Sequence, residues 1–266
     1  MPSPLYIITP EHSEAAGVVA SASVAAAAGA PVSNLLKPQP TDFYKSSTTA
    51  AVNIDIDLVS AKAVACAALL FTSLESGTTW SVLGATSQAN LTSSPGYNSG
   101  TLTLAGFFDQ ANITRRHLIH IPASVQTFRW WRFAISAQTA AFSAGCVILG
   151  PVWNPEVELG FQRGYTLLND PARTDGGNLI ATMPNLEPPV EATLTIQAVT
   201  EAIHEEQLQR IGRLRISGKP ILFVSDLATA NYTQQRVLYG LITAMSQIVV
   251  EQFNLWKCRM NLSGMI

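Results

Sequence analysis

Short runs of apolar or alternating residues, separated by turn residues, follow one another between about residue 50 and residue 155. Their spacing, roughly 8 to 12 residues, is typical of the strands of a β-sandwich. Clusters of Gly, Pro, Asn and Ser, such as SSPGYNSG at 93–100, mark the turns between the runs. The pattern predicts an antiparallel β-sandwich of the jelly-roll kind for residues 41–155. The expected strands lie in AAVNIDIDLV, AVACAALLFTSL, TTWSVLGAT, GTLTLAGFF, RHLIHIP, TFRWWRFAIS and AGCVILGPVW.

The run QTFRWWRFAISAQ combines two adjacent tryptophans with two arginines. In an extended strand, successive side chains point to opposite faces of the sheet. We expect the face that carries Trp131 and Phe133 to be core. The opposite face carries Phe128, Trp130 and Arg132, and it is either covered by the neighbouring domain or offered to a partner.

The pattern changes after about residue 155, where Pro151 and Pro155 interrupt further strand pairing. Thr200 is well placed as the N-cap of a helix at about 200–214, because apolar residues recur there at helical spacing. Apolar or alternating runs that are typical of strands precede and follow this helix. Residues 156–266 are therefore predicted to form a β-rich α+β domain with one main helix, and the protein as a whole to be mainly β.

Residues 1–40 precede the first predicted strand. Their stretch 15–33 consists mostly of Ala, Ser, Gly and Val, which suits either a short helix or a flexible arm. We favour an arm that becomes ordered only against a neighbouring molecule. The same stretch follows acidic residues and lacks Leu and Phe, so it is a poor signal or membrane segment. We expect no association with membranes.

The composition indicates a folded chain whose surface faces other protein. Of its 266 residues, 47% are hydrophobic and only 13% are charged, and the net charge is -2. Nucleic-acid binding normally rests on a concentrated positive field, which the sequence lacks. The cluster of Arg210, Arg213 and Arg215 is interpreted as a solvated helix end. We expect no specific nucleic-acid partner.

The residues that most often bind metals are not suitably spaced. Cys66, Cys146 and Cys258 are odd in number and far apart, so they form neither a disulfide framework nor a metal knuckle, and we expect buried thiols. His117 and His120, three residues apart on a predicted strand, point to opposite faces. The sequence predicts no metal site and no cofactor.

Two pairs of carboxylates raise the alternative of a hydrolase that acts on cell-wall polymer. Asp55 and Asp57 share one face of a predicted strand, as do Glu156 and Glu158, and paired carboxylates in a cleft can hydrolyse glycosides. Neighbours two residues apart more often form a polar strand face.

The stretch GRLRISGKP resembles a phosphate-binding loop at first sight but departs from it, because the glycine spacing is wrong by one and Pro220 replaces the hydroxyl residue. We expect no catalytic residue and no enzyme activity.

The closing part of the sequence, from EATLTIQAV to NLSGM, is similar to the closing domain of tailed-bacteriophage tail-tip and baseplate proteins of the distal-tail-like kind. The resemblance lies in the order strand, helix rich in Glu and Leu, G-x-P-x-L-F strand, loop, Y-G strand and final long strand. The matching residues are Gly218, Pro220, Leu222, Phe223, Tyr239 and Gly240.

The first half resembles a galactose-binding-like (discoidin-type) β-sandwich, which occurs joined to such a closing domain. The resemblance rests on NLLKP, IDIDL, TTWSVLGAT and FRWWRFAIS. The sequence departs from sugar-binding members of that family, because it lacks an evident cluster of Arg, Asn and Asp at loop tips.

Together the resemblances imply a structural virion component, made in the host cytoplasm and located in a phage tail. It would assemble as a ring, such as a hexamer or a trimer, and connect the tail tube and other tail proteins to fibres or receptor-binding parts. The alternative is a carbohydrate-binding module for attachment to a host-surface saccharide. The residues of the expected ligand or partner surface are Trp80, Tyr97, Trp130, Arg132 and Trp153.

Overall fold

The computed structural model describes residues 5–104, 116–155, 162–165, 172–173, 179–180, 190–216, 218–225, 234, 236–246, 249–252 and 255–265. The chain forms two compact units. The first contains Met1–Asn154 and Ile221–Val237, and the second contains Pro155–Pro220 and Leu238–Ile266. Both consist mainly of antiparallel strands, and the second also carries the main helix. The predicted fold class, mainly β with a sandwich and one main helix, is therefore confirmed.

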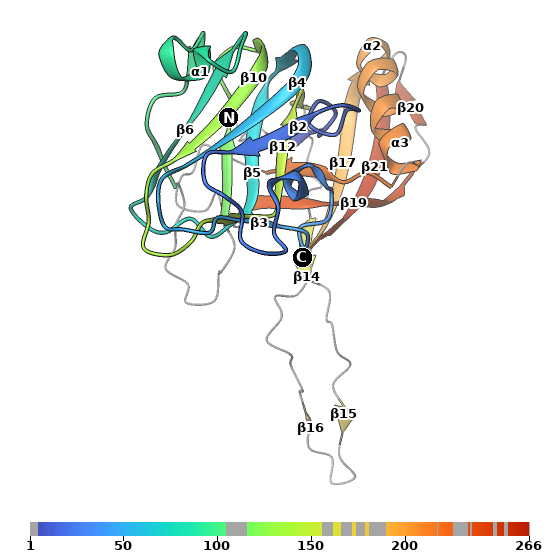
Figure 1. The fold of residues 1–266 in the computed structure, drawn as a ribbon. Coiled ribbons are helices and arrows are strands. Elements are labelled where there is room, and N and C mark those ends of the chain that lie inside the picture. The colour runs from blue at the N-terminus through green and yellow to red at the C-terminus, as the bar shows by residue number, and fades with distance from the viewer. Residues whose placement is uncertain are drawn as a thin grey trace. The chain divides into compact units, whose positions relative to one another are not determined.

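The larger sheet of the first unit has the strand order β2-β4-β10-β6-β7, with β8 also paired to β6 (Figure 1). All of its described pairs are antiparallel. The longest strands, β4 and β10, are neighbours near its centre, which suits them to carry side chains on two well-ordered faces. The strands are β2 (Val19–Ala22), β4 (Val52–Val64), β6 (Thr79–Ala85), β7 (Tyr97–Asn98), β8 (Leu102–Thr103) and β10 (Gln126–Ile135).

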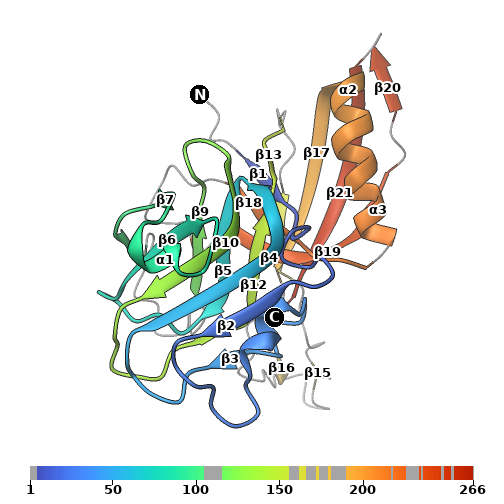
Figure 2. The same cartoon turned by 45° about the horizontal axis from the view of Figure 1, so that its top comes forward.

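The second sheet of the sandwich has the order β12-β5-β9 and comprises β5 (Cys66–Thr72), β9 (Arg116–His120) and β12 (Cys146–Gly150) (Figure 2). Side chains from both sheets meet in one hydrophobic core, among them Leu69 and Leu118 of this sheet. The predicted sandwich core is thus made by strands far apart in sequence. Shorter elements around it are η1 (Val32–Leu36), β3 (Tyr44–Lys45), α1 (Asn90–Ser93) and β11 (Ser143–Ala144).

Strand β10 shows the alternation that its sequence predicts. Trp131 and Phe133 are completely buried, and Ile135 is 2% exposed. Trp130 and Arg132 lie on the opposite face and are half-buried. The aromatic core face of QTFRWWRFAISAQ is therefore confirmed.

One residue of β10 departs from this alternation. Phe128 pairs with Lys62 and Trp130 pairs with Asp57, so the register shifts between Phe128 and Trp130. Phe128 packs against the core, and its ring centroid lies 6.2 Å from that of Trp131. The prediction that Phe128 shares a face with Trp130 is wrong, because strict alternation does not continue across a register shift.

Three further strands of the first unit, which belong to a larger sheet and which we call the third sheet, pair in the order β13-β1-β18. Strand β1 (Tyr6–Ile8) is antiparallel to both β13 (Val152–Trp153) and β18 (Ile221–Val224). Strand β18 comes from the second half of the sequence. The chain therefore returns to the first unit at β18, between two stretches of the second unit.

The described part of the segment 1–40, which we expected to be an arm, contributes elements to two sheets of the first unit. Strand β1 joins the third sheet, and β2 pairs with β4 at the edge of the larger one. Ile8 of β1 and Leu35 of η1 are completely buried. Burial of these few large side chains supplies a hydrophobic reason for the segment to pack on its own chain.

The second unit contains a sheet of order β19-β21-β17-β14, with β20 also paired to β21. A helix over 201–216 follows β17 directly and contains a π-helical turn, η2, at its centre; Figure 2 shows it lying along this sheet. Leu208 and Ile211 of the helix are buried, as its apolar spacing predicts. The elements are β14 (Gln162–Tyr165), β15 (Ala172–Arg173), β16 (Leu179–Ile180), β17 (Val190–Thr200), α2 (Glu201–Ile203), η2 (His204–Leu208), α3 (Gln209–Ile216), β19 (Val237–Met245), β20 (Val249–Gln252) and β21 (Leu255–Gly264).

The three cysteines, Cys66, Cys146 and Cys258, are buried and form no disulfide, in agreement with the expectation of buried thiols. Burial raises the pKa of the Cys66 thiol to about 12, since the thiolate would lose its hydration. Cys66 is therefore a packing residue of β5.

Candidate functional site

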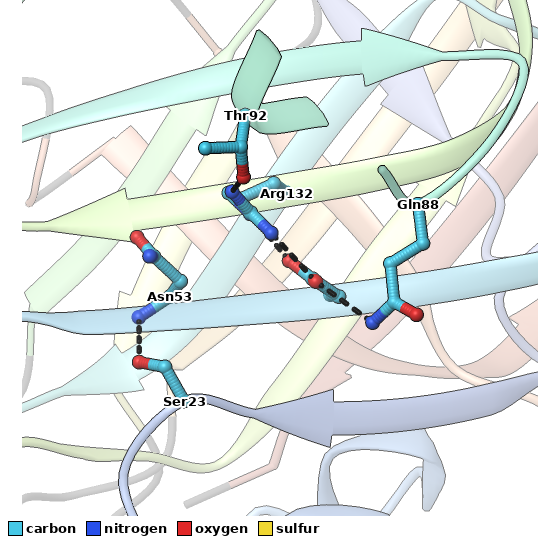
Figure 3. A network of polar contacts seen from close by, with 6 residues as sticks. Ser23, Asn53, Gln88, Thr92 and Arg132 are labelled. Carbon is cyan, nitrogen blue, oxygen red and sulfur yellow. Dashed lines mark hydrogen bonds and ion pairs between the residues drawn. The ribbon is translucent and has the colours of Figure 1, made fainter. Parts of the chain in front are cut away.

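A polar network lies on the face of the larger sheet opposite the core (Figure 3). Asp55 of β4 stands directly opposite Arg132 of β10. The Arg132 guanidinium donates two hydrogen bonds to the Asp55 carboxylate, from Nε to Oδ1 over 2.6 Å and from Nη2 to Oδ2 over 2.9 Å. Gln88 Nε2 donates to the same Oδ2 over 3.1 Å, and Arg132 Nη1 donates to Thr92 Oγ1 over 2.8 Å.

This network leaves little surface for a ligand. The side chains of Arg132 and Asp55 are only 12% and 8% exposed, and each forms at least three hydrogen bonds within the network. Because Gln88 precedes α1 and Thr92 lies in it, the network ties this segment to the sheet. Arg132, predicted to be part of a ligand or partner surface, is thus engaged in a structural ion pair.

A second ion pair lies beside the first and is more open. Arg129 donates from Nε and Nη2 to the two carboxylate oxygens of Asp57, both over 2.7 Å. The side chains of Arg129 and Asp57 are 44% and 15% exposed. The Arg129 guanidinium also lies over the Trp130 ring, 5.5 Å from its centroid, which is within the range of a cation–π contact. The hydrogen bonds from Arg129 lower the pKa of the Asp57 carboxyl below its ordinary value.

We define the candidate site as Asp57, Arg129 and Trp130. Trp130 stands opposite Asp57 on β4 and opposite Ala85 on β6, so its backbone is paired on both sides and its side chain projects from the middle of the sheet. The site offers an aromatic surface together with carboxylate and guanidinium groups of fixed orientation. It can bind a ligand that has both an apolar face and hydrogen-bonding groups.

The other predicted site residues lie elsewhere in the first unit. Trp80 is 5% exposed and belongs to the hydrophobic core, so its ring packs against protein. Trp153 stands opposite Ile7 in the third sheet and is half-buried. Tyr97 lies in the short strand β7. The structure therefore places Trp80, Tyr97, Trp130, Arg132 and Trp153 in different environments.

Tyr97 connects the two sheets of the sandwich. Its hydroxyl oxygen lies 2.5 Å from Nε2 of His120, which belongs to β9 in the smaller sheet. The Tyr97 ring also contacts Trp131 in the core, with centroids 6.2 Å apart. Burial lowers the pKa of His120, because the imidazolium would lose hydration. A neutral His120 can accept the hydrogen bond of the tyrosine hydroxyl.

The structure gives His117 a different role from His120. The Nδ1 of His117 accepts a hydrogen bond from the backbone N–H of Phe71, and the two rings meet edge to face.

The described part of the chain contains no group of three or more His, Cys, Asp or Glu side chains that could hold a metal ion. It also contains no helix long and apolar enough to cross a membrane.

The carboxylate pair of β4 is poorly suited to glycoside hydrolysis. A catalytic pair needs one carboxyl with a raised pKa to act as the acid. Asp55 and Asp57 are instead each held by an arginine, and the pKa of Asp57 is lowered. The other candidate pair, Glu156 and Glu158, lies outside the described residues.

No family model matches the sequence, and no curated protein matches it. Among solved structures, the chain is similar to chitosan-binding module 1 of a chitosanase/glucanase from Paenibacillus sp. IK-5. The identity is 16%, the match covers 53% of this chain and 100% of that chain, and the TM-score is 0.41. It is also similar to the family 32 carbohydrate-binding module of NanJ from C. perfringens, solved in complex with galactose, with 15% identity, coverage of 54% and 98%, and a TM-score of 0.38.

A third similar structure is the lectin binding domain of Lectinolysin, solved as a mutant complexed with Lewis b. Its identity to this chain is 12%, the match covers 54% of this chain and 97% of that chain, and the TM-score is 0.39. The first two structures are saccharide-binding modules, the third is complexed with Lewis b, and none of the three is a phage tail protein.

The first prediction concerns the buried ion pair. Replacing Asp55 by alanine should lower the free energy of unfolding by roughly 3 kcal/mol, because it leaves the largely buried Arg132 charge without its partner. Chemical denaturation of the full chain measures this loss. The matched variant Asp57→Ala, which breaks the more exposed pair, should cost clearly less, because the Arg129 charge that it leaves behind is open to water. Equal losses for the two variants would contradict the assignment of Asp55 and Arg132 as the structural pair.

The second prediction concerns pH. Because the pKa of His120 is lowered in the folded chain, the unfolded chain binds more protons as the pH falls through the ordinary histidine pKa of about 6.5. The contribution of His120 to stability is therefore complete above that pH and is lost as the pH falls through its lower folded pKa. His120→Gln should make the free energy of unfolding less dependent on pH between 7.5 and 5, as measured by urea denaturation at each pH. An unchanged pH dependence in this variant would count against the assignment.

Proposed function

We propose that the first unit is a non-catalytic binding module for saccharides, and that Trp130, Asp57 and Arg129 form its contact surface. A sugar ring has apolar C–H faces, which pack on an aromatic ring, and hydroxyl groups, which need donors and acceptors. Trp130 supplies the aromatic ring, and the Asp57–Arg129 pair supplies an acceptor and a donor. One observation carries the proposal: the Trp130 ring and the Asp57–Arg129 pair lie together on an exposed part of the sheet face. The neighbouring Asp55–Arg132 pair, in contrast, is enclosed by other protein groups.

The way in which the strands hold the three side chains of the site favours ligand binding. Its three side chains belong to the paired strands β4 and β10, and Asp57 also accepts a hydrogen bond from the backbone N–H of Val59 over 2.8 Å. Side chains held in this way lose little conformational freedom when a ligand arrives. The ion pairing of both aspartates disfavours acid–base catalysis at the same place.

A third prediction tests this function. The full chain should bind saccharides on a glycan array, and Trp130→Ala should weaken binding of the strongest saccharide at least about tenfold, as measured by isothermal titration calorimetry. Phe43→Ala is the control, since Phe43 is an aromatic residue of the same unit with 43% exposure and lies outside the candidate site. Its affinity should match that of the unaltered chain. An array without a bound saccharide, or full affinity in Trp130→Ala, would contradict the proposal.

A second candidate function is assembly with other protein subunits, as the resemblance to phage tail proteins implies. One observation favours a protein contact on the same face. Val19, which is 59% exposed, stands opposite Asp57 on β2, and Val59, which is 51% exposed, follows Asp57 on β4. Exposed apolar side chains close to Asp57 suit a contact with another subunit.

A fourth prediction tests assembly. If the chain is a ring-forming component, light scattering of the purified full chain should give a molar mass that is a fixed multiple of 28.5 kDa over a range of concentrations. A mass of one chain at all concentrations would contradict the ring. This outcome would leave the saccharide-binding proposal unaffected.

A further inference from the structure

The Arg129 side chain occupies one face of the aromatic ring that the proposed function assigns to a sugar. Its guanidinium lies over the Trp130 ring, 5.5 Å from the centroid, while both carboxylate oxygens of Asp57 hold it from the side. We infer that Arg129 is a displaceable cover on Trp130 and that Asp57 is the latch that keeps the cover in place. This inference rests on the proposed function for its biological meaning, although the cover can be tested without a saccharide.

The register shift in β10 explains how Arg129 reaches this position. Consecutive residues of a regular strand point to opposite faces, which would direct Arg129 toward the core side if Trp130 points outward. The register passes from Phe128 opposite Lys62 to Trp130 opposite Asp57, and gives Arg129 no partner residue on β4. Arg129 is accordingly exposed. Irregularities of this kind redirect single side chains, and here the two consecutive side chains can meet.

The latch is oriented by its own strand as well as by Arg129. Asp57 Oδ1 accepts a hydrogen bond from the backbone N–H of Val59, in addition to the one from Arg129. Val59 has a φ of 68°, which is unusual for a β-branched residue. This irregular stretch of β4 therefore places the Val59 N–H where it helps to orient the Asp57 carboxylate.

The cover is weakly held in comparison with the neighbouring ion pair. The side chains of Arg132 and Asp55 are 12% and 8% exposed and share further hydrogen bonds with Gln88 and Thr92. The Arg129 side chain is 44% exposed. Water can therefore compete for the hydrogen bonds that the Arg129 guanidinium donates to Asp57, whereas Arg132 is enclosed by protein groups. One of two adjacent arginine–aspartate pairs is thus fixed, and the other can open.

Displacement of Arg129 would have two consequences for a ligand. It would free the covered face of Trp130 for stacking, and it would release guanidinium donors for the hydroxyl groups of the ligand. Arg129 would then select ligands, since only those that offer both an apolar face and hydrogen-bond acceptors replace the contacts it loses. A purely apolar ligand would gain the ring but leave the guanidinium without a new acceptor.

A fifth prediction tests the cover directly. The full chain is labelled with 5-fluorotryptophan, and the ¹⁹F resonance of Trp130 is assigned with Trp130→Phe. The broadening of this resonance by a neutral gadolinium chelate then measures how accessible the ring is. Arg129→Ala and Asp57→Asn should each increase the broadening about twofold, because the first removes the cover and the second weakens the charged latch.

The control is Asp42→Asn, which weakens another exposed ion pair, that of Lys37 with Asp42. It should leave the Trp130 resonance unchanged. An absence of increase in Arg129→Ala overturns the cover, and an increase in Arg129→Ala without one in Asp57→Asn overturns the latch.

The glycan array separates this inference from the proposed function. Increased broadening together with an array that shows no bound saccharide would keep the cover and remove the saccharide-binding function. Binding of a saccharide that Trp130→Ala abolishes, without increased broadening in the two variants, would keep the function and remove the cover.

Discussion

The first unit depends on the burial of one face of β10 between two sheets. Trp131 and Phe133 project from this strand into the core, which they share with residues of β5, β9 and β12. The strand is paired on both sides, with β4 and with β6. Loss of this aromatic face would remove two of the largest fully buried side chains of the core. Because the inner face is fixed by burial, the outer face presents its side chains in a constant order.

The outer face of the sheet carries two aspartate–arginine pairs in different surroundings. Asp55–Arg132 and Asp57–Arg129 arise from two aspartates on β4 and two arginines on β10, but their surroundings differ. Gln88 and Thr92 enclose the first pair, so it stabilises the fold. The second pair lies beside Trp130 with much of Arg129 in solvent, so its polar groups are available to a ligand. Burial, more than residue type, decides which pair is structural.

The resemblance to phage tail proteins and the structure point to different parts of the molecule. The resemblance concerns the closing part of the sequence, whereas the candidate site lies on the sandwich of the first unit. The tail role stays a prediction. It is compatible with the proposed function, because a tail protein can carry a saccharide-binding module. Residue type alone does not place a side chain on a binding surface. Trp80, for example, lies in the core, and Arg132 is half of a structural ion pair.

The alternation of apolar residues was sufficient to predict the sandwich, the buried face of β10 and the helix after Thr200, because periodicity depends only on neighbours in the chain. The packing of residues 5–40 and the pairing of β18 with β1 could not be predicted in this way, since both join segments distant in sequence. The same holds for Arg129. Two arginines beside two tryptophans drew attention to this strand, but only the register shift against β4 decides that Arg129 lies over Trp130 while Arg132 is enclosed. Strand register is set by contacts across the sheet, and a single strand carries no record of its partner.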